Sequence, residues 1–559
     1  MFPGIAYNLF QSEKRNSSIQ LTNERSAPLP AFTGYLTFTV TSGYPASMRL
    51  NRGLGDHEEL PRAKDSLHFS TSPIYECSRR APIVGCRDSL NLDFARLICC
   101  LLTCLSRQSV KTAFSRAAKR LRVAICGAGI GGLTLAVALS QYPDIEVELY
   151  EAASTLAEVG AGVGIFPRPW KILKLLGLDQ DLLNTVELKP QEGAVPAFSW
   201  RKGDQHVGLP FGTLVTNGPL ITLHRADFQD ILLKRLPKSC RVNCSKRLRT
   251  YAQRQSGLTE LVFEDGTRAF CDVLVGADGL KSATRGAFLS ERVNWMQGQG
   301  RWQEASDLAS CIDPVWSGQI AYRALIPAER LNAIAPGHPV LTTPTQYLGK
   351  NAYVIAYPIS HGKMINFVAF ICRHDLENTE FDGPWVEPGD KSQFAQIFAH
   401  WEPDVQALVH CAEKPLRWAV HTVKPLRSFV SGRTALIGDA AHAMTPHQGS
   451  GAGQAIEDAY VLATVLGHRS TTRQTLPRSL RVFDEIRRPV AAGVVESSRM
   501  NGRYFSLEVD GVDFNRYAGP QLWDNLQKLN STIVKNWEWT WTTSVDGSIQ
   551  DALRRLETG

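Results

Sequence analysis

The chain has 559 residues, 43% of them hydrophobic and 21% charged, which is the composition of a globular protein long enough for two or more domains. The formal net charge is +7, and residues 1–118 account for most of it with 14 Lys and Arg against 9 Asp and Glu, so the nearly neutral remainder argues against nucleic acid as a partner. No apolar run reaches the ~18 residues of a membrane-spanning helix, and the twelve cysteines lack the spacing of a zinc site, so we expect a cytoplasmic protein with free thiols and no metal.

Residues 1–118 show no periodic hydrophobic pattern. Proline interrupts them repeatedly, and Ser, Thr and Arg are common. We therefore expect a mostly disordered N-terminal extension, with one helix around residues 92–118. Three explanations of this segment stay open: a dispensable tail, a targeting extension and a mis-joined translation of upstream sequence. Its acidic residues weaken the targeting explanation, because transit peptides are poor in acids.

The first chemical motif follows this extension. An apolar run, Leu121–Cys126, leads directly into Gly127-x-Gly129-x-x-Gly132, then a helical pattern of small residues, and then a second predicted strand that ends at Glu151. The three glycines permit, in order, a tight turn, close approach of a pyrophosphate, and close packing of helix on strand. The helix N-terminus favours phosphate, and Glu151 can accept hydrogen bonds from a ribose diol. The pattern predicts a site for FAD or NAD rather than NADP.

The next segments are mainly structural. Three glycines within residues 160–164 allow the backbone to lie against a flat ligand, although a plain loop explains them equally well. Short strands are predicted within residues 195–222, and a helix begins at Arg225, which alone reads as a surface arginine. Alternation on both sides of a turn predicts a hairpin whose strands cover residues 258–263 and 268–275.

Two further buried strands end in turns that contain an acid and a glycine. The first delivers Asp278 and Gly279 to a turn before a helix. The second ends at Asp439 and is followed by Pro446 and the glycine turn Gly449–Gly453. Asp439 at a strand end can bind a ribityl or ribose hydroxyl. The glycine turn presents N–H groups and a helix N-terminus to an anion.

Together the three motifs resemble those of group A flavoprotein monooxygenases, the FAD-dependent aromatic hydroxylases similar to salicylate and para-hydroxybenzoate hydroxylases. Their order and spacing agree over about residues 121–559, and Leu223–Asp227 resembles the family segment whose arginine lies near the flavin. The resemblance implies bound FAD, with NADPH or NADH as the transient reductant. It implies cofactor contacts at Gly127, Gly129, Gly132, Glu151, Gly164, Arg225, Asp278, Gly279, Asp439, Pro446, Gly449 and Ala452.

The fold implied is α/β: a Rossmann-like FAD-binding domain with a parallel sheet, interrupted by a smaller substrate-binding β-sheet domain. We expect FAD-binding segments at 119–189, 223–310 and 421–505, substrate segments at 190–222 and 311–420, and a C-terminal helical tail at 506–559. Three tryptophans in that tail, Trp537, Trp539 and Trp541, are expected to pack it onto the core.

Predicted strands between residues 320 and 370 carry our two catalytic candidates, Arg323 and Tyr357. An arginine can stabilise a substrate phenolate or carboxylate bidentately, and a tyrosine hydroxyl can orient that oxygen. A strand-edge ion pair and a packed sheet aromatic are the structural alternatives. Tyr353 is the alternative tyrosine on the same strand. His224, His442 and His447 are expected to be structural.

The activity implied is hydroxylation of a phenolic, salicylate-like or polyketide-derived ring with NAD(P)H and O2, through a C4a-hydroperoxyflavin. The helix N-terminus near Gly449–Ala452 suits the negative charge of reduced flavin. Two alternatives stay open: an epoxidase or other tailoring monooxygenase acting on an isoprenoid or other secondary metabolite, and a flavin-binding protein without turnover. The sequence leaves a monomer or a homodimer open.

Overall fold

A computed structural model describes residues 119–156, 162–186, 193–218 and 220–558 of the chain. The predicted N-terminal extension, its helix, and the start of the glycine-rich stretch 160–164 lie outside these residues. Within the described ranges the cysteines are free thiols. No helix in this part of the chain combines the length and the apolar character needed to cross a membrane.

A six-stranded sheet, in the order β18-β19-β11-β1-β2-β7, carries the first glycine motif. Its central strands pair in parallel: β1 with β2 and with β11, and β11 with β19. Their carboxyl ends therefore meet at one edge of the sheet, where ligands of such folds bind. The strands are β1 (Leu121–Cys126), β2 (Ile145–Tyr150), β7 (Arg241–Asn243), β11 (Val273–Gly276), β18 (Val430–Ser431) and β19 (Thr434–Leu436).

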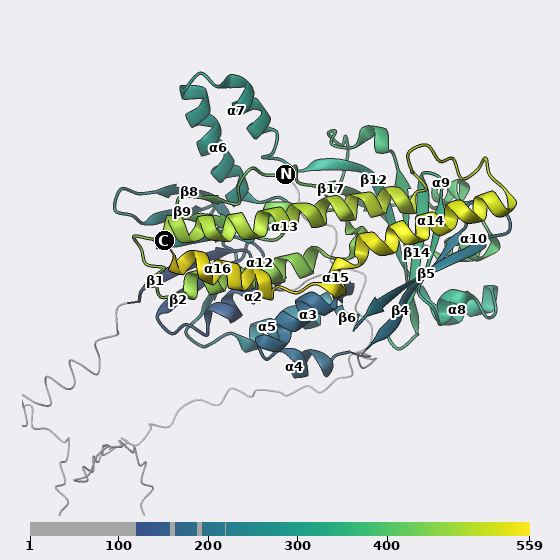
Figure 1. Cartoon of the computed structure of the whole chain (residues 1–559), viewed down its shortest axis with the longest axis horizontal. Coiled ribbons are helices and arrows are strands. Elements are labelled where there is room, and N and C mark those ends of the chain that lie inside the picture. The colour runs from purple at the N-terminus through teal and green to yellow at the C-terminus, as the bar shows by residue number, and fades with distance from the viewer. Residues whose placement is uncertain (1–118, 157–161, 187–192, 219, 559) are drawn as a thin grey trace, which may run out of the picture. The chain divides into compact units, whose positions relative to one another are not determined.

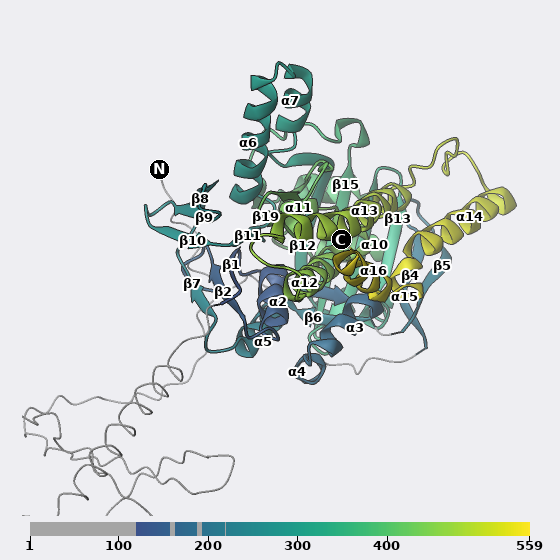
Figure 2. The same ribbon diagram turned by 60° about the vertical axis from the view of Figure 1, so that its left-hand side comes forward.

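Helices cover this sheet. Nearly every residue of α2 (Ile130–Leu139) is buried, and this helix packs against α12 (Gly451–Gly467). α2 is therefore apolar on all sides rather than amphipathic. Nearby lie α3 (Pro167–Leu175), α4 (Asp179–Leu183) and α5 (Arg225–Arg235). The pair α6 (Ala283–Gly298) and α7 (Trp302–Ala309) projects away from these helices in both views (Figure 1, Figure 2).

An eight-stranded sheet, in the order β16-β17-β12-β15-β14-β13-β4-β5, forms the second layer of strands. It comprises β4 (Ala194–Lys202), β5 (Leu209–Asn217), β12 (Val315–Pro327), β13 (Thr345–Gly349), β14 (Ala352–Ile359), β15 (Met364–Cys372), β16 (Val386–Pro388) and β17 (Leu416–Thr422). One face packs on α8 (Ala328–Ile334), α9 (Lys391–Ile397) and α10 (Pro403–Cys411) in a common apolar cluster. The opposite face is called here the substrate face, after the prediction that it binds substrate. It carries Ala321, Tyr353 and Val368, which form one apolar cluster with Phe505 and Leu526 of the C-terminal helices.

A long helix, α13 (Leu476–Phe505), connects the two cores (Figure 1). Leu480 and Phe483 near its start lie in the cluster under the six-stranded sheet, whereas Phe505 at its end lies in the cluster of the substrate face. The chain continues through α14 (Gly519–Trp537), α15 (Trp539–Thr542) and α16 (Asp546–Glu557). Short 3-10 turns are η1 (Pro339–Leu341), η2 (His374–Leu376) and η3 (Pro446–Gln448).

Two small sheets complete the described fold. β3 (Gly162–Ile165) pairs with β6 (Ile221–His224), and β8 (Leu248–Gln253), β9 (Thr259–Phe263) and β10 (Arg268–Cys271) form a three-stranded sheet. The prediction of one strand over residues 268–275 is wrong, because the chain divides at Asp272. That carboxylate is fully buried and accepts the Arg122 backbone N–H at 2.8 Å, which fixes the switch from hairpin to parallel sheet.

Candidate active site

The first glycine motif forms the turn between β1 and α2. Gly127 has φ +104°, and a Cβ there would lie 2.2 Å from the Ala277 carbonyl oxygen. A Cβ at Gly132 would lie 2.0 Å from the Gly127 carbonyl oxygen, whereas a Cβ at Gly129 would meet no atom within 4 Å. Packing therefore requires glycine at 127 and 132, and Gly129 borders open space at the helix N-terminus, as a phosphate site needs.

Two helix N-termini lie beside one another at this place. α2 begins after Gly129 with no side-chain cap and no acid in its first turn, and α12 begins after Ser450 in the same way. A Cβ at Gly131 would lie 3.2 Å from the Ala455 Cβ, so the first turn of α2 contacts the second turn of α12. Their N–H groups and positive dipole ends favour an anionic ligand.

The second and third motifs join the same cluster. Gly438, with φ +58°, also packs on Ala455, since a Cβ there would lie 3.1 Å from the Ala455 Cβ. Arg285, which follows the second motif, is almost fully buried and donates to the Ala440 carbonyl at 3.1 Å. Motifs about 150 residues apart in the chain thereby share one site at the carboxyl edge of the sheet.

The three predicted acids differ in their surroundings. Glu151 accepts the backbone N–H groups of Ala128 and Ala153, each at 2.8 Å, so it also holds the first glycine turn. Asp439 is exposed as the first residue of α11 (Asp439–His442), where it can meet a ligand hydroxyl.

The Asp278 carboxylate is hydrogen-bonded to residues at the start of α6. Its carboxylate accepts the Ser282 hydroxyl at 2.5 Å and the Thr284 backbone N–H at 2.9 Å, and so caps α6. Gly279 beside it has φ +74° and open space around its Cβ position. In the second motif, open space therefore borders Gly279, and Asp278 shapes the turn. Both residues stay predicted cofactor contacts.

The β3–β6 ribbon contacts α12 and also reaches the eight-stranded sheet. Gly164 pairs with Thr222, and Gly162 pairs with His224, the residue before Arg225. A Cβ at Gly162 would lie 3.7 Å from the Tyr357 hydroxyl oxygen. The ribbon thus brings Gly162 next to Tyr357 and holds Gly164 and Arg225, both predicted from the resemblance, within two residues of that contact along the paired strands.

Both catalytic candidates lie on the substrate face. Arg323 pairs with Val368, and Tyr357 pairs with Asn366, so the two side chains flank β15 two residues apart in register and on one face. The Arg323 guanidinium lies 5.8 Å from the Trp418 ring centroid. Burial raises the pKa of Tyr357, and the Arg323 charge lowers it in part, which places the two groups within electrostatic reach.

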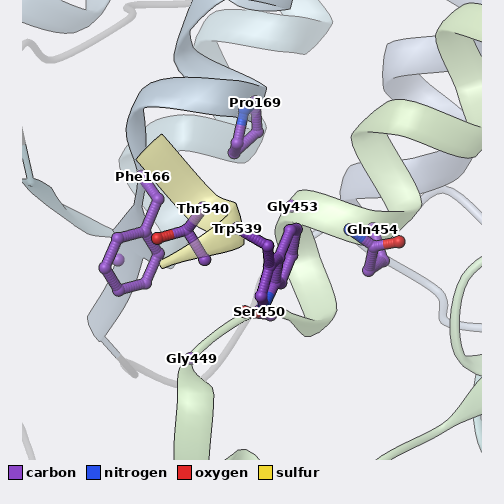
Figure 3. A pocket seen from close by; sticks show the side chains of 9 residues that line it. Phe166, Pro169, Gly449, Ser450, Gly453, Gln454, Trp539 and Thr540 are labelled. Carbon is purple, nitrogen blue, oxygen red and sulfur yellow. The ribbon is translucent and has the colours of Figure 1, made fainter. Parts of the chain in front are cut away.

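A cavity opens where β3, α12 and α15 meet (Figure 3). Its wall comes from three parts of the chain: Gly164, Phe166 and Pro169; Gly449, Ser450, Gly453 and Gln454; and Trp539 and Thr540. The sequence predicts only that Trp537, Trp539 and Trp541 pack the C-terminal tail onto the core. Trp537 does pack, at 2% exposed, but Trp539 also lines this cavity, a role that its sequence position gives no signal for.

The C-terminal segment also holds the glycine turn. The Trp539 indole N–H donates to the Gln448 side-chain oxygen at 3.3 Å, and the Gln448 amide donates to the Asn536 carbonyl at 2.9 Å. Arg168 at the start of α3 donates to the Thr543 hydroxyl at 2.6 Å. Residues 536–543 therefore support the turn that precedes α12.

A buried charge cluster lies behind the cofactor side of the site. Arg487 donates to Glu457 and to Asp458, each at 2.8 Å; Arg168 donates to Glu457 at 2.7 Å, and His442 lies 2.6 Å from Asp458. Burial raises the pKa of Asp458, but His442, Arg487 and the Gly438 N–H together lower it to about 2. The charged carboxylate holds Gly438, whose N–H lies 2.9 Å away, and so supports the third motif.

These features fit a flavin dinucleotide: two uncapped helix N-termini, open space at Gly129 and Gly279, and the acids Glu151 and Asp439 at strand ends. Among the described residues, no group of three or more His, Cys, Asp or Glu is arranged to hold a metal ion. The site defined by the fold is thus that of a dinucleotide-binding flavoprotein.

Comparison with known proteins agrees with this assignment of the site. The model of the FAD binding domain family matches residues 120–348 and 391–498. Salicylate hydroxylase of Pseudomonas putida is 35% identical over 78% of this chain and 95% of its own length, and 6-methylsalicylate 1-monooxygenase of Aspergillus terreus is 31% identical over 78% and 92%. The solved structure of a salicylate hydroxylase substrate complex covers 78% of this chain and 98% of its own, with 31% identity and a TM-score of 0.65.

The chain therefore belongs to the FAD binding domain family of flavoprotein monooxygenases and is an FAD-dependent oxidoreductase. This confirms the family resemblance, the α/β fold with a parallel sheet, and FAD as cofactor. The individual site residues and the domain boundaries stay predictions.

Proposed function

We propose that this enzyme hydroxylates a phenolic ring that carries a carboxylate, a salicylate-like or polyketide-derived substrate, with NAD(P)H as reductant. The single observation that carries the proposal is the placement of Arg323 and Tyr357 on one face of the sheet, beside the ribbon that bears Gly162 and Gly164. The relatives named above act on salicylate and 6-methylsalicylate, which share a ring hydroxyl and a carboxylate.

The reaction balances with one reductant for each oxygen inserted. NAD(P)H, a proton, O2 and the aromatic substrate yield NAD(P)+, water and the hydroxylated product. Bound FAD, once reduced, supplies the activation of O2. The residues of this chain supply binding, orientation and exclusion of water.

Each candidate has a distinct task in this scheme. Arg323 pairs with the substrate carboxylate, which a planar guanidinium binds bidentately. The Tyr357 hydroxyl orients the phenolic oxygen, and the burial that raises its pKa keeps it protonated as a donor. The two uncapped helix N-termini hold the negative charges of FAD.

The substrate face provides a dry surface for the ring. Phe198 meets Tyr357 edge to face with ring centroids 6.2 Å apart, and Val368 is buried between Arg323 and Ile355. Apolar walls of this kind exclude water from the reacting oxygen and so limit loss of reducing equivalents as peroxide.

The test is NADPH and NADH consumption by the FAD-loaded protein with four probes: salicylate, 4-hydroxybenzoate, phenol and benzoate. Salicylate should stimulate oxidation at least tenfold over the basal rate, with product formed in preference to peroxide. Phenol and benzoate should stimulate less, because each lacks one of the two groups that Arg323 and Tyr357 bind. Equal stimulation by all four, or none by any, would contradict the assigned substrate class.

A further inference from the structure

A buried polar pair joins the substrate face to the glycine turn that precedes α12. The Tyr353 hydroxyl on β14 lies 2.7 Å from Nδ1 of His447 in η3, although the residues are 94 positions apart. Tyr353 is 2% exposed and His447 6%. Both sequence interpretations, Tyr353 as a substitute for Tyr357 and His447 as structural, leave this contact unnoticed.

The protonation of the pair follows from burial. Burial lowers the pKa of His447 to about 3, so the imidazole is neutral at pH 7. Burial also raises the pKa of Tyr353 well above 10, so the phenol keeps its proton. Both side chains are therefore neutral. With the Tyr353 O–H assigned as the donor to Nδ1, the imidazole proton lies on Nε2.

The surroundings hold the imidazole tightly. The Phe370 and Phe505 rings meet the imidazole edge to face, with ring centroids 5.4 and 6.3 Å away, and Phe370 also stacks on Tyr353. A Cβ at Gly502 on α13 would lie 2.5 Å from His447 Nε2, so helix backbone closes the other side. His447 thus has little room to move without moving the turn.

A third group extends the pair. In the described part of the chain, His447 Nε2 and the Gln319 side-chain oxygen are buried without a hydrogen-bond partner. The Gln319 amide nitrogen lies 3.1 Å from the same Gly502 Cβ position, so the two side chains are neighbours. Because the two ends of a glutamine amide exchange by a half-turn, the Gln319 oxygen can face the Nε2–H.

We propose that Tyr353 and His447, backed by Gln319, form a positioning pair that fixes the turn Pro446–Gly449 and the N-terminus of α12 relative to the substrate face. The inference rests on the placing of FAD at this turn. The pair acts through the turn that it holds. It sets the position of the helix end that applies positive potential to the flavin, and it ties that position to the sheet that holds the aromatic ring.

The experiment replaces the hydroxyl and keeps the ring. Tyr353→Phe, in the FAD-loaded full chain, should leave the FAD dissociation constant within about threefold of wild type. Sulfite is the probe of the flavin environment, because its adduct with oxidised flavin is anionic and is stabilised by the α12 N-terminus. The sulfite dissociation constant should rise at least threefold in Tyr353→Phe.

Tyr347→Phe is the matched control. Tyr347 is equally buried on the neighbouring strand β13 but lies in the cluster of the opposite face, and its hydroxyl has no partner among the described residues. It should leave the sulfite constant unchanged. An equal shift in both variants, or no shift in Tyr353→Phe, would overturn the proposal.

Substitutions of His447 separate positioning from simple packing. His447→Asn keeps an acceptor near the Nδ1 position and should stay within twofold of wild type, whereas His447→Leu should shift the sulfite constant as Tyr353→Phe does. The double variant Tyr353→Phe/His447→Leu should raise the sulfite dissociation constant no further than the larger of the two single substitutions does. A rise equal to the product of the two single effects would contradict a shared contact. A wild-type protein that binds FAD but hydroxylates no phenol contradicts the proposed reaction alone, because sulfite titration requires neither substrate nor NADPH.

Discussion

At the scale of single residues, two glycines of the first motif differ in the space around their Cα atoms. A Cβ at Gly132 would lie 2.0 Å from backbone, whereas one at Gly129 would meet nothing within 4 Å. The same amino acid is therefore required for two reasons, folding at one position and ligand approach at the other. Substitution by alanine should separate these reasons in one experiment.

Gly129→Ala should fold with wild-type stability and bind FAD at least tenfold more weakly, a loss of about 1.4 kcal/mol, because the added methyl occupies the place of the pyrophosphate. Gly132→Ala should instead lower the free energy of unfolding by about 1–3 kcal/mol. Urea unfolding and FAD fluorescence titration measure the two effects. A stable Gly129→Ala protein with unchanged FAD affinity would remove this residue from the site.

Arg323 permits a sharper test of the substrate class. Arg323→Met should raise KM for salicylate at least tenfold and leave KM for phenol within about twofold, because phenol has no carboxylate to pair. Arg417→Met is the control, since Arg417 pairs with Tyr322 in the sheet register and therefore lies on the opposite face. Equal effects of Arg323→Met on both probes would assign Arg323 to packing against Trp418.

At the scale of elements, the buried charge cluster ties α3, α11, α12 and α13 together behind the third motif. Arg487, Glu457 and Asp458 are fully buried, and each charge has an opposite partner. A complete cluster of this kind adds little net stability, but removal of one member leaves an uncompensated charge in a medium of low dielectric.

Arg487→Met should therefore lower the free energy of unfolding by about 3–5 kcal/mol at pH 7. The folded-state pKa of Asp458, about 2, lies below its ordinary 3.8, so this carboxylate stabilises the wild type above about pH 4 and loses that effect as pH falls toward 2. Without Arg487 the folded pKa rises, so the two proteins should approach each other in stability below about pH 4. Urea unfolding across pH checks this.

The surface arginine Arg555 is the control for that series. It pairs with Glu485 and Asp551 but is 41% exposed, so Arg555→Met should cost less than about 1 kcal/mol and show no such pH dependence. A gap between wild type and Arg487→Met that stays constant from pH 7 to pH 3 would contradict the assigned charge state of Asp458.

Elements near the glycine motifs could be predicted because their signals are local. Strand β1, helix α2 and Glu151 lie within one short stretch of sequence. The residue type at each motif position there has a physical reason that the sequence alone displays. The break at Asp272 could not be predicted, since residues on both sides are extended and only a partner 150 positions away, Arg122, fixes it.

The candidate site shows the same division. The glycines and strand-end acids follow from backbone chemistry, which sequence displays directly. The contacts of Tyr353 with His447 and of Trp539 with Gln448 join residues about 90 positions apart. Their residue types are equally common in plain cores, so spacing carried no signal for them.

At the scale of the whole molecule, the first described residues are held by contacts with later parts of the described chain. Arg120 pairs with Asp144 and donates to the Leu466 carbonyl at 3.0 Å, and the family match starts at the same residue. Relatives cover 78% of this chain while using 92–95% of their own length. Residues 1–118 are thus outside the region that the family model matches.

A chain that begins at Lys119 should therefore fold and load FAD as the full chain does, with an unfolding temperature within about 2 °C. Flavin absorbance per protein and thermal unfolding with and without residues 1–118 measure this. An insoluble or colourless shortened protein would show that the N-terminal segment takes part in folding.

The cavity wall formed by Trp539 has a consequence for the order of events during synthesis. Gly129 leaves the ribosome about 400 residues before Trp539, which at ~5–20 residues per second is on the order of 20–80 s. β11 lacks its neighbour β19 until Leu436 has emerged, and the turn at Gly449 lacks its support from its own synthesis until Trp539 emerges. We therefore expect FAD to be captured late, by molecules in which residues 536–543 have reached the turn.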